Sequence, residues 1–308
     1  MAEKIKFTVA GFFTKKTIIN KLLSLYEEYS YMFKKNIEIN TLYDSFPDLR
    51  WNGGRVLGNS PIDLDQILLN IRHVNSLNIG INLTFSNTFI TEDDLLDKNC
   101  NNILKILSKN SLNGVIISSN LLGEYIKKNY PTINVILSVT YFYHNIYNIE
   151  EKVIEIMKLE KYDKVVIPPD LNSDIEFLNK LHHKSHIEVL INETCYQNCI
   201  YKSQHYRLIN MDNKNKTNHS RNYCQKQYLD IKNTYGLINN FSELSKYREI
   251  GIENFKISAR SLSDKIFIYF LSEYLINDAY KQNFFDYMSE QPINNLNFIE
   301  IYKEHLVW

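Results

Sequence analysis

Glycine, proline and cysteine are scarce in this sequence, with 9, 6 and 4 of them among 308 residues. Long apolar runs are missing as well. No window holds about 18 uninterrupted apolar residues, so we expect no transmembrane helix, and the first residues lack the apolar segment of a signal peptide. Few cysteines in a chain without a signal indicate a reducing compartment, and the cytoplasm is the default prediction.

An excess of one charge is also missing, because 35 basic residues balance 35 acidic ones and the sequence pI is about 7.1. Proteins that bind nucleic acids usually carry a basic excess. A local basic patch at Lys214, Lys216 and Arg221 is the one exception that the sequence leaves open. Composition therefore argues against a nucleic-acid or membrane partner.

Three of the four cysteines fall within one stretch, which begins at the strand-like run from His186 and ends at Cys224. Cys195 and Cys199 follow the run directly, and a polar loop over 210–223 leads to Cys224. Three thiolates that converge just past a strand suit a soft metal, such as zinc, or an iron–sulfur cluster. Two other interpretations stay open, namely buried cysteines that act as small hydrophobes and a disulfide.

Three ligands leave one coordination position for another residue or for substrate. His205 and His219 lie in the same region and are candidates for the fourth ligand. Glu193 precedes Cys195 by two residues. It is a candidate catalytic acid or base beside the metal, or else a loop residue that binds backbone.

Apolar β-branched runs alternate with amphipathic stretches along the whole chain, which predicts a parallel sheet with helical crossovers. Expected strands are 5–12, 37–43, 79–85, 114–118, 133–139, 164–167, 187–191 and 254–258, and expected helices are 16–34, 61–77, 91–108, 121–129, 149–159, a helix to 181, one within 235–250, and 262–278. Candidate N-caps are Ser60, a capping box at Thr91, and Asn172 or Ser173.

Eight β-α units in about 250 residues are typical of a TIM-like (β/α)8 barrel. A doubly wound sheet is the alternative. We expect a single domain, with the barrel over 1–280, a long cysteine-bearing insertion over 195–234 between units seven and eight, and a tail over 281–308 that packs on the barrel. Long loops in compact domains are usually functional.

A barrel would place its site at the carboxyl ends of the strands. Those ends are polar and mostly uncharged, which suits a small polar or anionic substrate; they read Asp44–Arg55, Ser86–Asn87, Ser118–Asn120, Tyr141–Asn145, Pro168–Asp170, Asn192–Cys195 and Ser258–Arg260.

The stretch Asn52, Gly53, Gly54 and Arg55 is a candidate substrate-binding loop. Adjacent glycines let backbone N–H groups approach an anion, and an arginine can clamp a carboxylate or phosphate. A plain surface turn is the alternative.

Lys256 and Arg260 flank the end of the last predicted strand and are further candidates for substrate binding. Lys256 belongs to the site if it points into the barrel and is structural if it points outward. His144 is a candidate general base near neutral pH, although a histidine in an aromatic run is often structural.

Three segments resemble the collagenase-like peptidase family of unknown catalytic type. Val165–Asp174 resembles that family's sixth-strand segment, Asn192–Cys199 with Cys224 is similar to its cysteine region, and Gly251–Arg260 resembles its "G-hydrophobic-acidic-x-F-K-I-x-G-R" end. The chain departs from the family where Asn192, Glu193 and Thr194 replace His-Gly-Ala, and where Ala259 replaces a glycine.

The resemblance implies a 4Fe–4S cluster on four cysteines, since the family includes iron–sulfur proteins that hydroxylate quinone precursors and RNA bases without oxygen. Cys195, Cys199 and Cys224 match cluster ligands. Cys100 has no clear counterpart and is either the fourth ligand or an ordinary helix cysteine.

These observations favour an iron–sulfur-dependent barrel enzyme in which Arg55 and Arg260 bind an anionic group and Glu193 or His144 moves a proton. A peptidase-like hydrolase is the second hypothesis, with Cys195 as nucleophile and His205 or His219 as base. The third is a non-catalytic, cluster-binding subunit of a homo- or hetero-oligomer, whose aromatic tail (Phe284, Phe285 and 302–308) forms a contact surface.

Overall fold

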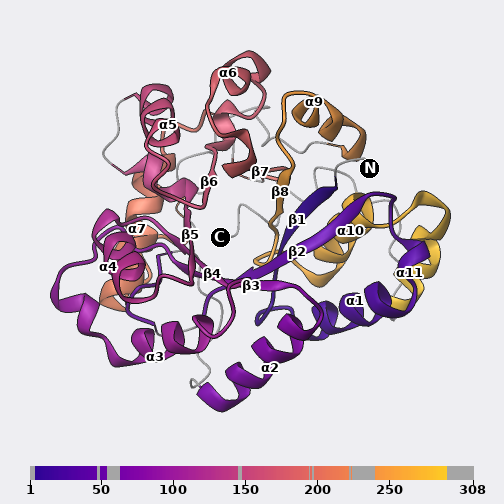
Figure 1. Cartoon of the computed structure of the whole chain (residues 1–308), viewed down its shortest axis with the longest axis horizontal. Coiled ribbons are helices and arrows are strands. Elements are labelled where there is room, and N and C mark those ends of the chain that lie inside the picture. Colours follow the sequence, from indigo (N-terminus) through magenta and orange to yellow (C-terminus); the bar gives the residue numbers. More distant parts are fainter. Residues whose placement is uncertain are drawn as a thin grey trace.

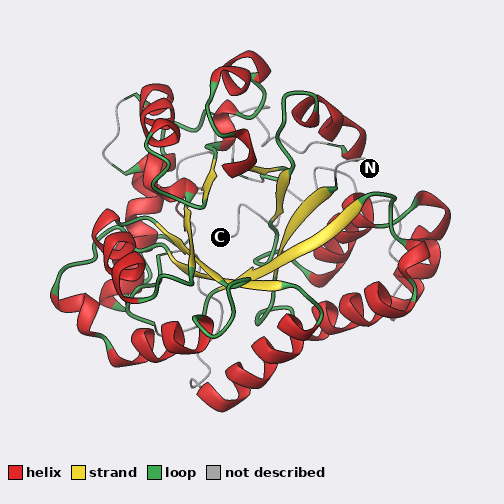
Figure 2. Cartoon of the chain, viewed as in Figure 1, coloured by secondary structure: helices red, strands yellow, loops and turns green. Residues whose placement is uncertain are grey.

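The computed structural model describes residues 4–46, 49–53, 63–144, 148–193, 195, 198–221, 223 and 240–289. Eight parallel strands pair in chain order, and β1 pairs with β8 to close the barrel. Figures 1 and 2 show the strands at the centre and the helices around them. The predicted (β/α)8 barrel is confirmed, and closure excludes the doubly wound sheet.

The strands are β1 (Ile5–Ala10), β2 (Ile37–Asp44), β3 (Gly80–Phe85), β4 (Gly114–Ile117), β5 (Asn134–Leu137), β6 (Lys164–Val166), β7 (Ile187–Leu190) and β8 (Asn254–Ile257). The main helices are α1 (Lys16–Glu28), α2 (Leu64–Ser76), α3 (Lys98–Leu107), α4 (Asn120–Asn129), α5 (Ile149–Lys158), α6 (Ile175–Lys180), α7 (Lys202–Asn215), α9 (Leu244–Arg248), α10 (Asp264–Leu275) and α11 (Lys281–Met288).

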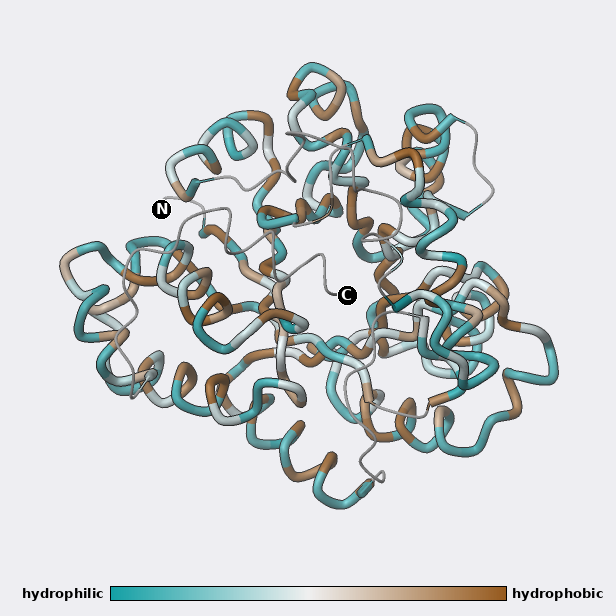
Figure 3. Tube along the Cα trace, turned by 180° about the vertical axis from the view of Figure 1, so that it is seen from behind, coloured by the Kyte–Doolittle hydropathy of each residue, from teal (hydrophilic) through white to brown (hydrophobic). Residues whose placement is uncertain are grey.

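Alternation along the strands separates a hydrophobic layer from a polar barrel interior. Phe7 in β1 packs on Phe255 in β8, which in turn packs on Tyr247 of α9, so this face of the strands meets the helices. Thr8, the next residue, points inward and contacts Thr41 in β2 at 2.8 Å. Figure 3 shows hydrophobic residues recurring along the strands and on the helices around them.

The pairing of β1 with β2 contains one irregularity. Phe7 pairs with Ile39 but Thr8 pairs with Thr41, so one extra residue of β2 bulges between them. A bulge shifts every later side chain of its strand by one position. The shift turns Tyr43 into the barrel and puts Asp44 beside the loop after β1.

Three predicted helix starts are wrong in detail. Helix α2 begins after Asp63, whose side chain accepts from the N–H groups of Asp65 and Gln66. Helices α3 and α6 are likewise capped by Asp97 and Asp174. Several capping residues compete within a few positions of each start, and packing of the helix selects one of them. Ser60 lies outside the described residues.

The expected irregular insertion contains helix α7, and the loop predicted from Asn210 is helical as far as Asn215. Few apolar residues mark this helix, which explains why periodicity missed it. After α7 the chain turns, and the Asp212 carboxylate accepts from Thr217 Oγ1 at 2.6 Å and from the N–H groups of His219 and Ser220 at 2.8 and 2.7 Å.

The start of the predicted tail forms α11, which packs against α10 and α1. Phe284 is completely buried there, so the predicted contact surface does not include it. Residues 290–308 lie outside the described part of the chain, so the rest of the tail and the domain boundary at 280 stay predictions. None of the described helices has the length and apolarity to cross a membrane.

Candidate active site

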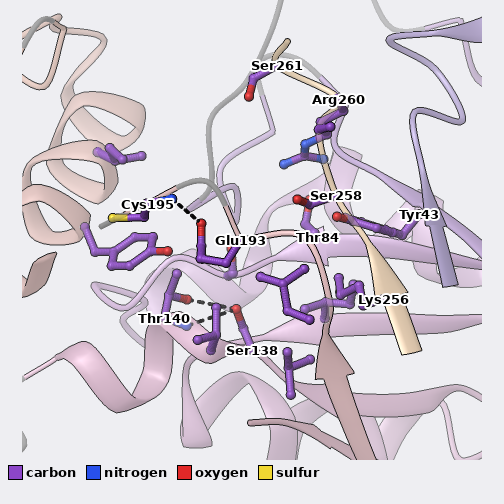
Figure 4. A pocket seen from close by; sticks show the side chains of 18 of the residues that line it. Tyr43, Thr84, Ser138, Thr140, Glu193, Cys195, Lys256, Ser258, Arg260 and Ser261 are labelled. Carbon is purple, nitrogen blue, oxygen red and sulfur yellow. Dashed lines mark hydrogen bonds between the residues drawn. The ribbon is translucent and has the colours of Figure 1, made fainter. Parts of the chain in front are cut away.

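A cavity of about 190 Å³ lies at the carboxyl ends of the strands, with α7 along one side. Inward-facing residues at or after the strand ends form most of its wall (Figure 4). They are Tyr43, Thr84, Ser86, Ile116, Ser138, Val139, Thr140, Val166, Leu190, Glu193, Cys195, Lys256, Ser258, Ala259, Arg260 and Ser261, and α7 adds Lys202, His205, Tyr206 and Ile209.

Lys256 lies in the cavity wall and is only 7% exposed. Its ammonium nitrogen lies 4.0 Å from the centroid of the Tyr43 ring and 3.5 Å from Glu188 Oε2. Burial lowers the pKa of Lys256, and the charge of Arg260 acts in the same direction against the attraction of Glu188. The amine therefore loses its proton more easily than an ordinary lysine does.

Glu188 supports Lys256 from inside the barrel. Thr8 Oγ1 donates to its Oε1 at 2.6 Å, which orients the carboxylate. Burial by itself would raise the pKa of Glu188, but the positive charges of Lys256 and Lys164 outweigh burial and leave the pKa below its usual range. A charged carboxylate is therefore kept beneath the cavity.

Arg260 and Asp44 form a buried ion pair at the rim, with 2.8 Å between Nη1 and Oδ1. The other oxygen of Asp44 accepts from the N–H groups of Phe13 and Thr14 at 2.9 and 2.8 Å, and from Thr14 Oγ1 at 2.8 Å. The pair thus ties the turn after β8 to the loop after β1. It also fixes the position of Arg260 in the cavity wall.

Ala259, just before Arg260, has φ of +84°. This conformation favours glycine, because a Cβ atom is crowded there. The family that the sequence resembles has glycine at this position. Here the turn directs Arg260 toward Asp44.

We expect Ala259→Gly to raise the free energy of unfolding by up to about 1 kcal/mol, because relief of the strained φ slightly exceeds the added freedom of the unfolded chain. Urea unfolding measures the effect. Ala10→Gly, in regular strand, is the control and should destabilise. A clear loss of stability in Ala259→Gly would contradict the strain argument.

The thiols of Cys195 and Cys199 contact each other beside the cavity. The backbone N–H of Cys195 donates to Glu193 Oε1 at 2.7 Å, which directs this carboxylate toward the cavity (Figure 4). The hydrogen bond with Cys199 raises the pKa of the Cys195 thiol well above its usual value, and burial and Glu193 add to the rise. Lys202 acts in the opposite direction.

Lys202, the first residue of α7, is held by the carboxylate of Asp170 at 2.7 and 2.9 Å. Tyr143 Oη and the N–H of Asn198 donate to the same carboxylate at 2.6 and 2.8 Å. Burial would lower the pKa of Lys202, but its interactions with Cys195, Glu193 and Asp170 raise it. A firmly held ammonium group therefore faces the thiols.

Helix α7 is also fastened at its far end. Asn210 Oδ1 accepts from the N–H of Thr88, and Lys214 Nζ donates to the carbonyl of Phe89 at 2.9 Å. Tyr206 stacks on Tyr143 with 5.6 Å between ring centroids. The helix therefore bridges the loops after β3, β5 and β6 and carries His205 into the cavity wall.

The predicted substrate-binding loop is only partly described, because Gly54 and Arg55 lie outside the described residues. Asn52 is buried, and its carbonyl accepts from Asn87 Nδ2 at 2.9 Å. Gly53 packs on the backbone of Ser86, where a Cβ would collide. Neither residue is among those of the cavity wall, and their role as substrate ligands stays a prediction.

Cys100 lies in α3 within the hydrophobic core, and burial raises the pKa of its thiol. His144 packs edge-on against Phe89 with 5.3 Å between ring centroids, and neither it nor Cys100 is among the residues of the cavity wall. Burial and Arg207 lower the pKa of His144.

His219 is exposed after α7. Cys224 lies outside the described residues.

Among the described residues, no group of three or more histidine, cysteine or acidic side chains is placed to hold a metal ion. Cys195 and Cys199 are two of the four predicted ligands, and the structure brings these two together. Sequence reasoning missed Tyr43, Thr84, Ser138, Lys202 and Tyr206. Thr84 and Ser138 could have been found from inward alternation, but Tyr43 depends on the β2 bulge, and Lys202 and Tyr206 depend on the unpredicted α7.

No family model matches this chain, and no curated protein matches it at a significant level. Among solved structures, it is similar to a U32 peptidase, Mk0906, with 12% identity over 84% of this chain and 93% of that one, and a TM-score of 0.48. It is also similar to a GH113 β-1,4-mannanase, with 11% identity over 94% and 99% and a TM-score of 0.31. U32 is the collagenase-like family of the sequence resemblance, and membership of it stays a prediction.

Proposed function

We propose that this chain is a barrel enzyme that acts on a small anionic substrate and holds a 4Fe–4S cluster on Cys195, Cys199 and Cys224. The substrate would bind in the cavity at the carboxyl ends of the strands, called the mouth cavity below. The observation that carries the proposal is the contact between two thiols beside a cavity that contains Lys256 and Arg260. Zinc on the same cysteines is the alternative.

The residues present fit such a group in their donor chemistry. Two thiols already converge, and the ammonium of Lys202 faces them. Thiolate ligands and cluster together carry negative charge, which a nearby cation stabilises. Cys224 would supply the third thiolate. Cys100 is buried in the hydrophobic core and is not one of the proposed ligands.

When bound, the group would supply a redox centre or a Lewis acid. The chain's own residues have separate tasks. Arg260 attracts the anionic part of the substrate, and the Glu193 carboxylate takes or gives a proton in the cavity. Oxygen-independent hydroxylation, which the sequence resemblance implies, is the specific reaction to test first.

A cysteine hydrolase is the second candidate, because Cys195 and His205 line the same cavity. A nucleophilic cysteine needs a lowered pKa to provide thiolate. The pKa of Cys195 is raised instead. The hydrolase is therefore the less supported of the two.

Anaerobic purification with iron and sulfide analysis tests the cluster. We expect the reconstituted protein to show a broad visible absorption band and about four iron atoms per chain. Zinc with no iron would support the alternative metal. Less than one iron atom per chain after reconstitution, with no zinc, would remove the metal-dependent function.

A further inference from the structure

We propose that Lys256 is a nucleophile whose amine forms an imine with the carbonyl group of a small, hydroxylated, anionic substrate in the mouth cavity. The inference deepens the proposed function and rests on it only in placing the substrate in this cavity. It does not depend on the cysteines or on any metal.

The position of the amine suits this role. Lys256 is in a strand of a closed barrel, so its backbone is held on both sides by β1 and β7. The Tyr43 ring lies against the ammonium and limits its contact with water. A rigid, poorly hydrated amine in a cavity wall is the arrangement that imine-forming lysines need.

The ion pair with Glu188 is loose enough to let the amine react. The distance of 3.5 Å exceeds the roughly 2.7–2.9 Å that is usual for a charge-assisted hydrogen bond. Thr8 occupies the other oxygen of the carboxylate. Arg260 and burial both disfavour the charged form of Lys256 and support the same conclusion.

The rest of the wall indicates the class of substrate. Hydroxyl groups of Thr84, Ser138, Thr140 and Ser258 line the cavity with Arg260. A hydroxyl both donates and accepts, so such a wall suits a hydroxylated molecule, while Arg260 supplies positive charge for a phosphate or carboxylate. A volume of about 190 Å³ suits a small molecule.

The step balances without an added reactant. The neutral amine adds to the carbonyl carbon and forms a C–N bond. Both protons of the amine nitrogen move to the oxygen, which leaves as water, and the C=N bond results. In the experiment, borohydride is the reductant that converts the imine into a stable secondary amine.

Lys164 provides a matched control. It lies in β6 and interacts with the same Glu188, and burial lowers its pKa as well. It does not line the cavity. Any reagent that modifies lysines merely because their pKa is low should therefore label both residues.

The test incubates the full-length protein with dihydroxyacetone phosphate or hydroxypyruvate, followed by sodium borohydride, and maps the adduct by peptide mass spectrometry. We expect one adduct per chain on Lys256, retained in Lys164→Arg and at least tenfold lower in Lys256→Arg. Mapping in the unaltered protein locates the adduct even if Lys256→Arg fails to fold. Adducts spread over surface lysines, or none on Lys256 with either compound, would overturn the imine.

Calorimetry with glycerol 3-phosphate, which has no carbonyl group, separates this inference from the proposed function. Binding of glycerol 3-phosphate without an adduct on Lys256 refutes the imine but leaves an anion site in the cavity. Failure of both measurements removes the imine and the anionic substrate together.

Discussion

We expect Cys195→Ala, Cys199→Ala and Cys224→Ala each to lose nearly all of the iron of the proposed cluster, and Cys100→Ala to keep it. Loss of one of three cysteine ligands leaves too few thiolates for a stable cluster. Cys100 lies in the hydrophobic core away from the cavity wall, so its replacement only trims the packing of α3. The loss should be close to complete, because ligation of the proposed metal would also compensate the entropy of ordering the chain that carries Cys224.

Iron and sulfide per chain after anaerobic reconstitution measure this effect. Limited proteolysis is the second measurement, and we expect the three ligand variants to be cut between Thr217 and Tyr223. A Cys224→Ala protein that keeps full metal content and resists the protease would show that the three-cysteine site is wrong. Loss of iron in Cys100→Ala would return that residue to the ligand set.

Asp44→Ala should lower the free energy of unfolding by about 3–5 kcal/mol, as expected when one partner of a buried ion pair is removed. Arg260 would then be left without the carboxylate that it contacts at 2.8 Å. The N–H groups of Phe13 and Thr14 would lose their acceptor at the same time. Arg260→Ala should cost less, because Asp44 keeps those donors.

Urea unfolding of the two variants and of the double variant measures the coupling between the residues. The pair of Lys15 and Asp264 is the control, because its carboxylate, unlike that of Asp44, lies on a side chain that is 69% exposed. Exposed pairs contribute only about 0–1 kcal/mol, so Asp264→Ala should be nearly neutral. An Asp44→Ala protein as stable as Asp264→Ala would show that the ion pair of Asp44 and Arg260 does not stabilise the fold.

Sequence reasoning located the strands closely because a strand of a parallel barrel is a short, mostly apolar run, which a few neighbouring residues reveal. The run from Ile37 to Tyr43 became β2 with one residue added, and the run from Asn254 became β8 with one removed. Helix starts were less accurate, because Asp63, Asp97 and Asp174 compete with nearby residues for the cap.

The candidate site was predicted in part for a similar reason. A barrel gathers the residues at the strand ends, so Glu193, Cys195, Lys256 and Arg260 could be chosen from the sequence, and all four line the cavity. The glycine loop at Gly53 follows a strand as well. It packs on the backbone after β3, which no local pattern reveals.

By itself, the sequence determined the alternation of strands and helices, and with it the barrel and the end at which polar residues collect. These follow from hydrophobic periods and chain length, which are local properties. Only the tertiary structure decided that Asp44 meets Arg260, 216 residues away, and that α7 carries Lys202 to Asp170 and Cys195. Such pairings depend on the β2 bulge and on barrel closure, because electrostatic partners are chosen by distance in space, and the distance exists only once the chain has folded.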